Sequence, residues 1–285
     1  MIKKLFVFSQ YLTPQLSLSR LAGRLADSTG TPALRSRFIR WFIDRYGVNM
    51  SEAENSDPDA YESFNDFFTR ALKPGLRPLE GNESTLVSPV DGCVSQLGSI
   101  NAGRIFQAKG QSFSLLELLG GDQQRADIFN DGEFATIYLA PGDYHRIHMP
   151  LAGQLREMVH VPGRLFSVNP ATAANVPNLF ARNERVVCLF DTAAGPMALV
   201  LVGAMIVGSV ETPWAGVVAP GDGGVSQQSY SPDQALTFAR GEEMGRFRLG
   251  STVVMVMPKG RVQWNDAQKP GKKVTLGEVF GEANA

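Results

Sequence analysis

The character of the chain changes after Pro74 and Gly75, and this change constrains the fold more than any other feature. From about Thr85 onward, short runs of Val, Ile, Leu and Phe alternate with Gly, Pro, Asn and Asp. Apolar runs bounded by turn residues are typical of β-strands. The sequence therefore predicts a mainly antiparallel β core with one short helix near Ser114. The expected strands cover residues 86–90, 134–140, 186–191, 199–207 and 252–258.

Three helices are expected before this β region. Apolar side chains recur at roughly helical spacing in residues 5–25, where Pro14 should break or kink the pattern. A second helix should cover Pro32–Tyr46 and end at Gly47, because glycine commonly follows the last helical turn. A third pattern of apolar residues covers residues 64–72.

The connections between these patterns suggest how the chain is organised. Residues 51–59 are acidic and rich in turn formers, as in a linker, and Ser63 with Asp66 forms a variant of a capping box. No internal repeat is visible. We therefore expect an α+β fold in which an amphipathic helical segment, residues 1–73, is attached to a β domain, residues 74–285.

Charge is distributed unevenly along the chain. The 27 basic and 28 acidic residues give a net charge of −1, which makes non-specific nucleic-acid binding improbable. Residues 1–46, however, carry eight basic and two acidic side chains, or +6, and the remainder carries −7. Two interpretations stay open from composition alone. The helices either pack on a core with solvated arginines or rest on an anionic lipid surface.

The sequence favours a reducing compartment and predicts no membrane span. Cys93 and Cys188 form no CxxC or metal-binding spacing. The longest apolar stretch, residues 197–210, is interrupted by glycines and shorter than the roughly 18 residues that cross a bilayer. The N-terminal apolar run is too short for a secretory signal. These features are typical of a cytoplasmic protein.

Two of the three histidines, His145 and His148, lie in the segment Pro-Gly-Asp-Tyr-His-Arg-Ile-His-Met-Pro of residues 141–150; the third is His160. Within a strand, side chains three positions apart face opposite sides, whereas a turn could bring both rings into one pocket. A pair of histidines without a third ligand is weak evidence for a metal, so no metal site is predicted.

Two further motifs could carry chemistry. Asp91 lies in Ser-Pro-Val-Asp-Gly-Cys, where an Asp-Gly turn ends an apolar run, and Ser251 lies in Leu-Gly-Ser-Thr directly before the apolar strand of residues 253–257. Taken alone, each motif is an ordinary turn or loop.

Taken together, the motifs resemble those of the phosphatidylserine decarboxylase family of bacterial, pyruvoyl-dependent type. The similarity covers nearly the whole chain, and the order in which the motifs follow one another makes the resemblance specific. The matching segments include residues 64–70, 88–92, 143–148, 175–185 and 249–252.

The resemblance implies that the chain cuts itself between Gly250 and Ser251, leaving a β chain of 250 residues and an α chain of 35 residues. Glycine suits the position because it lacks a Cβ and tolerates strained dihedral angles. Attack by the hydroxyl gives an ester, which eliminates to dehydroalanine and hydrolyses to a pyruvoyl group with loss of ammonia. This group, derived from Ser251, would be the only cofactor.

The family's motifs also imply roles for individual residues. His148, oriented by Asp91, would be the base that takes the proton of the Ser251 hydroxyl. The three residues would then have the same roles as in any Ser/His/Asp set. His145 would act in the substrate step, by contacting an anionic group or returning a proton. Ser167 is a weaker polar candidate in the same pocket.

The implied substrate is phosphatidylserine, whose amine would form a Schiff base with the pyruvoyl carbonyl before carbon dioxide leaves. A lipid substrate favours the membrane interpretation of the helices, with Lys3, Lys4 and Arg20 near anionic head groups. We therefore expect a peripheral protein on the cytoplasmic face of the cell membrane. By resemblance, the α and β chains stay associated and the protein is a homodimer.

Three other functions compete with this interpretation. A pyruvoyl enzyme acting on a soluble amino acid would share the self-cleavage but would not need lipid-facing helices. A serine hydrolase using Ser251, His148 and Asp91 would keep an intact chain. A non-catalytic β module at a membrane surface would use the Gly-Ser element as an ordinary loop.

Overall fold

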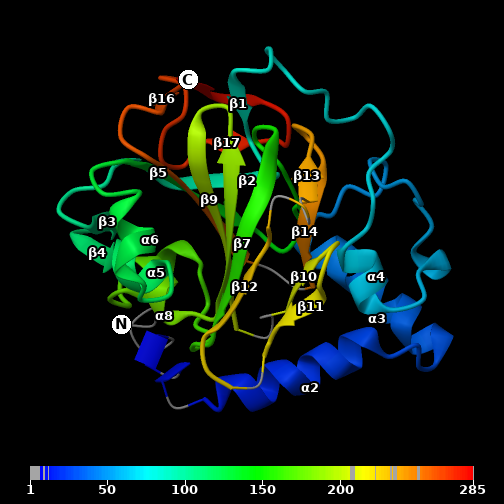
Figure 1. Ribbon diagram of the computed structural model, residues 1–285. Coiled ribbons are helices and arrows are strands. Elements are labelled where there is room, and N and C mark those ends of the chain that lie inside the picture. Colours follow the sequence, from blue (N-terminus) through cyan, green and yellow to red (C-terminus); the bar gives the residue numbers. More distant parts are fainter. Residues whose placement is uncertain are drawn as a thin grey trace.

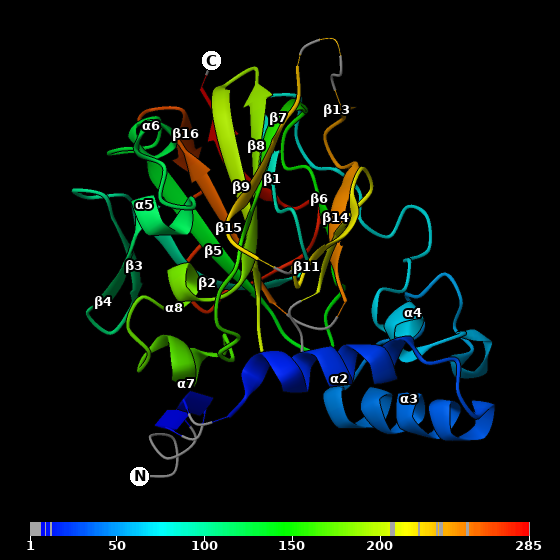
Figure 2. The same cartoon turned by 60° about the horizontal axis from the view of Figure 1, so that its bottom comes forward.

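A computed structural model describes residues 7–8, 10–11, 13–205, 209–221, 223–231, 233, 236–248 and 251–284, without the side chains of Leu16 and Ser251. The strands form a central body, and the N-terminal helices lie along one side of it (Figures 1 and 2). The expected α+β class with a mainly β core is confirmed.

The two long helices lie near the start of the chain, after helical residues at 7–8 and 10–11, and the later helices are short. The helices are α2 (Gln15–Asp27), α3 (Pro32–Tyr46), α4 (Phe64–Phe68), α5 (Leu115–Leu118), α6 (Gln123–Asp127), α7 (Pro170–Ala173) and α8 (Leu179–Arg182), with a 3-10 turn η1 at Pro58–Ala60. Pro14 precedes α2, as expected, and Gly47 ends α3 with a φ of 65°. This left-handed conformation favours glycine.

Helix α4 is shorter than the sequence pattern suggested. Its start is as expected, because the Ser63 side chain accepts a hydrogen bond from the backbone N–H of Asp66. The helix ends at Phe68 instead of continuing to Leu72. The Thr69 hydroxyl donates to the carbonyl of Asn65, and Leu72 forms a β-bridge with Ala53. Tertiary pairing therefore overrides the helical periodicity of this segment.

The strands form one large sheet and three smaller ones, and all pairings between them are antiparallel. The large sheet runs, in spatial order, through β12 (Ser226–Ser229), β7 (Gly153–Val161), β8 (Arg185–Thr192), β9 (Gly195–Gly203), β15 (Ser251–Met257), β5 (Glu133–Leu139), β2 (Gly92–Ser99) and β17 (Lys273–Val274), with β13 (Leu236–Phe238) also paired to β7. The second sheet holds β11 (Gly216–Ala219), β10 (Val210–Thr212), β14 (Glu243–Phe247) and β6 (Arg146–His148). The others are β1 (Thr85–Val87), β18 (Val279–Ala283) and β16 (Val262–Trp264), and the hairpin of β3 (Arg104–Ala108) and β4 (Gln111–Ser114).

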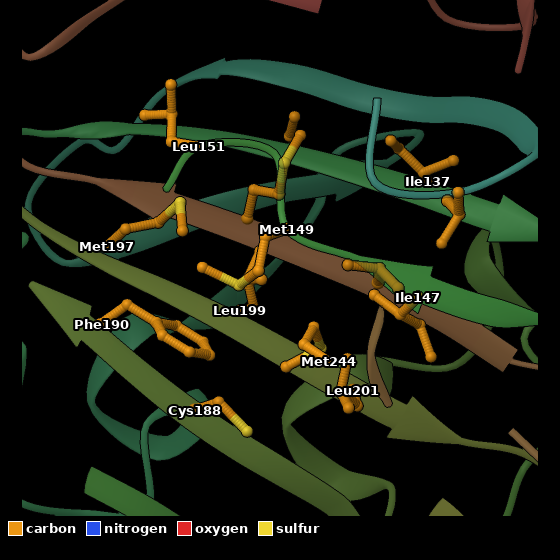
Figure 3. Close-up of a cluster of buried hydrophobic side chains, with 14 of the residues drawn as sticks. Ile137, Ile147, Met149, Leu151, Cys188, Phe190, Met197, Leu199, Leu201 and Met244 are labelled. Carbon is orange, nitrogen blue, oxygen red and sulfur yellow. The ribbon is translucent and has the colours of Figure 1, made fainter. Parts of the chain in front are cut away.

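The large sheet is buried on both faces. Leu199 and Leu201 of β9 belong to a cluster shared with Met244 of β14, and Figure 3 shows these side chains together. The alternate residues Val200 and Val202 belong to a second cluster, which includes side chains from α5 and α8. A strand that is buried on both faces has a continuous run of apolar residues. This explains the uninterrupted run of Val and Leu in β9.

The helical segment has its own cluster of buried side chains and is joined to the β body by specific contacts. Phe42 of α3 packs with the phenylalanines of α4. Arg146 of β6 donates to the carbonyl of Thr69 at 2.8 Å, and Arg248 pairs with Asp27 at the end of α2 at 2.9 Å. Within the described residues, no helix is both long and apolar enough to span a bilayer.

Some strand positions differ from expectation. Strand β9 starts and ends about four residues earlier than predicted, because it follows a tight turn at Ala193 and Ala194 from β8. Residues 206–207 of the predicted strand lie outside the described residues. The nine-residue β7 was not predicted, since its polar residues Gln154, Arg156 and Glu157 interrupt the apolar pattern.

The close approach of β5 and β15 predicts which glycine the fold cannot replace. A Cβ on Gly132 would overlap the carbonyl oxygen of Met257, a backbone atom that cannot move aside without disturbing β15. We expect Gly132→Ala to lower the free energy of unfolding by about 2 kcal/mol, measured by denaturant titration. Gly23→Ala is the control: its Cβ would meet no atom within 4 Å, and alanine favours a helix by up to about 1 kcal/mol. Equal stability of the two variants would contradict the role of this approach.

Candidate active site

Ser251 is the first residue of the central strand β15. Its backbone pairs with Leu139 of β5 on one side and with Gly203 of β9 on the other. Gly250 and the Ser251 side chain lie outside the described residues. The position of Ser251 is nevertheless fixed by two neighbouring strands, so the surroundings of the Gly-Ser element can be built from the residues that flank Leu139 and Gly203.

A tight turn leads from Leu139 to the two histidines. The Asp143 carboxylate accepts from the backbone N–H of Ala140 at 2.7 Å, and the Asp143 N–H donates to the Ala140 carbonyl at 2.9 Å. Arg70, from the segment after α4, donates to the carbonyl of Gly142 at 3.0 Å. A Cβ on Gly142 would lie 2.7 Å from the carbonyl oxygen of Tyr46, the last residue of α3. Position 142 therefore requires glycine.

His145 is fully buried against the helical segment. Its ring lies 4.1 Å from the ring of Phe68, measured between centroids, and its Nδ1 is 2.8 Å from the carbonyl oxygen of Asp143. Because a carbonyl can only accept, Nδ1 carries the hydrogen. Nε2 is then the acceptor, and it has no hydrogen-bond partner among the described residues. Burial, reinforced by the charge of Arg70, lowers the pKa of His145 to about 3.

His148 faces the other way. It lines a cavity of about 320 Å³ together with Tyr144, Arg146 and Glu243, and His145 is not part of this lining. Its Nδ1 is 2.8 Å from the carbonyl oxygen of Gly241, and its Nε2 is 3.1 Å from the Tyr144 hydroxyl. Burial lowers the pKa of His148, and the hydrogen bond to Gly241 opposes that shift. The sequence left open whether the two histidine rings share one pocket. In the structure, the two rings have separate surroundings.

Asp91 lies near His148 without contacting it. Its carboxylate accepts from Arg77 at 2.6–3.2 Å and from the backbone N–H of Leu276 at 2.8 Å. Arg77 also pairs with Glu52 at 2.7 Å. The orientation of His148 that was expected from Asp91 comes instead from the Gly241 carbonyl. The negative charge of Asp91 only raises the pKa of His148 through space.

Ser167 belongs to a loop that is tied to the strand position opposite Ser251. The amide of Asn183 donates to the carbonyls of Phe166 and Gly203 at 2.8 Å each, and its oxygen accepts from the Phe166 N–H at 3.1 Å. The Ser167 hydroxyl accepts from Asn169 at 2.9 Å. The fully buried Asn183 was not predicted from the sequence, because an asparagine before a strand is usually only a turn residue.

This arrangement suits proton transfer. Both histidines hold a hydrogen on Nδ1 against a backbone carbonyl and therefore present Nε2 as the acceptor. Both are neutral near pH 7 because burial disfavours the imidazolium form. The described part of the chain contains no grouping of three or more His, Cys, Asp or Glu side chains suited to a metal ion.

Comparisons with known proteins agree with this architecture. A family model described as phosphatidylserine decarboxylase matches residues 64–282, and a second, described as PSD, matches residues 5–47. A phosphatidylserine decarboxylase proenzyme of Marinobacter nauticus is 70% identical over 284 residues, which cover 100% of this chain and 99% of the relative. Proenzymes of the same name from Hahella chejuensis and Bordetella pertussis are 62% and 58% identical over 279 residues, covering 98% and 97% of this chain and 94% of each relative.

The fold is that of an α+β enzyme, and its two buried, neutral histidines follow, within ten residues of chain, the backbone partner of the first residue of a central strand. With the comparisons, its class is that of the carboxy-lyases. The chain belongs to the phosphatidylserine decarboxylase family.

The burial of His145 predicts a loss of stability in acid. The unfolded chain takes up a proton at this imidazole near its ordinary pKa of 6.5, whereas the folded chain does not do so until about pH 3. Stability is therefore lost as the pH falls below about 6.5, by about 2 kcal/mol between pH 7 and pH 5. Denaturant titrations at both pH values should show a smaller loss for His145→Gln. An equal loss in the variant and the parent protein would show that His145 is not held neutral.

Proposed function

We propose that this chain is the proenzyme of a pyruvoyl-dependent phosphatidylserine decarboxylase that cuts itself between Gly250 and Ser251. The observation that carries the proposal is the ten-residue segment 139–148. It begins at the backbone partner of Ser251 and ends at a neutral histidine that lines a cavity and has its acceptor nitrogen against the Tyr144 hydroxyl. The names of the relatives, which are proenzymes, support the same conclusion.

In the proposed cleavage, the Ser251 hydroxyl attacks the carbonyl carbon of Gly250, and His148 receives the proton at Nε2. The resulting ester loses the α-proton of Ser251 and releases the Gly250 carboxylate, and the dehydroalanine left behind takes up water and loses ammonia. The Gly241 carbonyl keeps His148 in the required tautomer. Asp91, which is paired with Arg77, contributes negative charge near His148.

The two products should stay together, because residues 251–285 supply strands to different parts of the β body. Strand β15 lies between β5 and β9, β17 pairs with β2, and β18 pairs with β1. Separating the chains would require the large sheet to open along three ladders at once. This topology supports a stable complex of α and β chains.

The residues around Ser251 fit a pyruvoyl group. His145 offers an Nε2 atom that is buried without a partner, as expected of a group that awaits substrate. The pyruvoyl group itself supplies the electron sink for the loss of carbon dioxide from an amino-acid carboxylate. His145 would hold or return the proton at the carbon that loses carbon dioxide, and Ser167 would offer a hydroxyl to the substrate.

The helical segment supports action at a lipid surface. Leu25 of α2 and Leu34 of α3 are 67% and 68% exposed, and with Trp41 they line an apolar cavity of about 620 Å³ between the two helices. Arg20 is exposed on α2, whereas Lys3 and Lys4 lie outside the described residues. Exposed apolar side chains next to basic ones are typical of helices that lie in a membrane interface.

We therefore propose a peripheral protein on the cytoplasmic face of the membrane, in which residues 1–73 form the membrane-surface segment and residues 74–285 the catalytic domain. The free thiols of Cys93 and Cys188 are consistent with a reducing compartment. A homodimer is proposed from the family resemblance.

Mass analysis of the purified chain tests the proposed cleavage. We expect two polypeptides of 250 and 35 residues, the smaller one with a carbonyl-reactive, blocked N-terminus, and decarboxylation of phosphatidylserine but not of free serine. Ser251→Ala should remain whole because the attacking hydroxyl is missing. Ser226→Ala, on the edge strand β12, is the control and should be cut normally.

The outcomes separate the competing functions. An uncut wild-type chain that is labelled by a fluorophosphonate would identify a serine hydrolase. A cut chain that prefers free serine would identify a pyruvoyl enzyme for soluble substrates. An uncut, unlabelled chain would indicate a binding module.

Vesicle flotation tests the proposed membrane surface. We expect Leu34→Glu combined with Trp41→Glu to reduce binding to vesicles that contain phosphatidylserine by about tenfold or more, because exposed apolar area is replaced by negative charge. The control is Phe106→Glu combined with Val225→Glu, which alters exposed apolar residues (45% and 56%) outside the helical segment. High salt should also weaken binding. Equal binding by both double variants would refute the proposed surface.

A further inference from the structure

Tyr144 has a specific contact that the proposed mechanism has not used. Its hydroxyl is 3.1 Å from Nε2 of His148, the nitrogen that would serve as the base. The two rings lie 5.7 Å apart between centroids and are tilted by 32°. Tyr144 is only 6% exposed, so burial keeps its hydroxyl beside this nitrogen.

The direction of this hydrogen bond follows from the other side of the imidazole. Nδ1 of His148 must carry its hydrogen because it faces the Gly241 carbonyl. Nε2 of the neutral ring can then only accept, so the Tyr144 hydroxyl is the donor. The lone pair that a base would use is therefore already bound to a phenolic proton.

In the sequence, Tyr144 lies between the backbone partner of Ser251 and the proposed base. Leu139 is the backbone partner of Ser251, and Tyr144 lies five residues further along the turn and four residues before His148. Tyr144 and His148 line the same cavity, with Arg146 and Glu243 paired at its wall. For a proton to reach Nε2, Tyr144 must either turn away or pass on its own proton.

We propose that Tyr144 relays the proton between the Ser251 hydroxyl and His148 during self-cleavage, an inference that rests on the proposed function. As the Ser251 oxygen bonds to the carbonyl carbon of Gly250, its proton moves to the Tyr144 oxygen and the Tyr144 proton moves to Nε2. When the carbon–nitrogen bond breaks, the proton returns by the same route to the amine of Ser251. Tyr144 begins and ends as a neutral phenol, and no other reactant is needed.

The titration behaviour of the pair supports such a relay. Burial raises the pKa of Tyr144 to about 12, so the phenol does not give up its proton to solvent. Burial also lowers the pKa of His148, so the ring is neutral and able to accept. A donor and an acceptor held in contact, each in its neutral form, can move two protons together, so that His148 takes up the charge and the phenol stays neutral.

Removal of the hydroxyl tests the relay. In Tyr144→Phe, freshly synthesised chain should form the two fragments at least about 100-fold more slowly, the low end of what positioned proton transfer contributes. Tyr61→Phe is the matched control, because Tyr61 is also 6% exposed and its hydroxyl donates to the backbone carbonyl of Asn55, in the helical segment. Thermal unfolding of both uncut variants checks that each is folded.

A series of fluorinated tyrosines at position 144 separates a relay from a structural role. The fluorines change the acidity of the phenol with little change in shape, so a relay predicts that the cleavage rate changes steadily with the phenol pKa. Cleavage of Tyr144→Phe at the parent rate would overturn the proposal, and so would a flat fluorotyrosine series. If the parent chain itself is never cut, the proposed function fails instead.

Discussion

The pairing of β15 with β5 and β9 is the constraint on which the rest of the structure depends. Val253 and Met255 face one core cluster and Val254 and Val256 face the other, so the strand is buried on both sides. Its register with Leu139 and Gly203 places Ser251 where the apolar strand begins. A shift by one residue would exchange the two faces, so packing fixes the position of the reactive element.

The helical segment contacts the proposed site and also carries the proposed lipid surface. Tyr46 of α3 abuts Gly142, Phe68 of α4 packs on His145, and Arg70 donates to the turn that carries both histidines. The sequence suggested a boundary between residues 73 and 74. That boundary stays a prediction; the end of α4 lies against His145, so the proposed site would draw on residues from both sides of it.

Local patterns predicted much of the fold. The helix Pro32–Tyr46 was predicted with both ends correct, because proline, apolar spacing and Gly47 agree there, and the strand before residue 258 was predicted within one residue. The short α4 and the polar strand β7 were missed because their conformations depend on partners distant in the chain. In the site, motifs identified Asp91, His145 and His148, but not their partners Arg77, Tyr144 and Gly241. Those contacts arise from tertiary packing, which spacing along the sequence cannot reveal.

The ion pairs of Arg248 have a consequence for the end that a cut would create. Arg248 pairs with Asp27 of α2 at 2.9 Å and with Glu211 of β10 at 3.4 Å, and it lies two residues before the expected break. One guanidinium would therefore hold a newly formed carboxyl terminus close to both α2 and the β body. The leaving end could travel only as far as two residues of chain allow, unless those carboxylates release it.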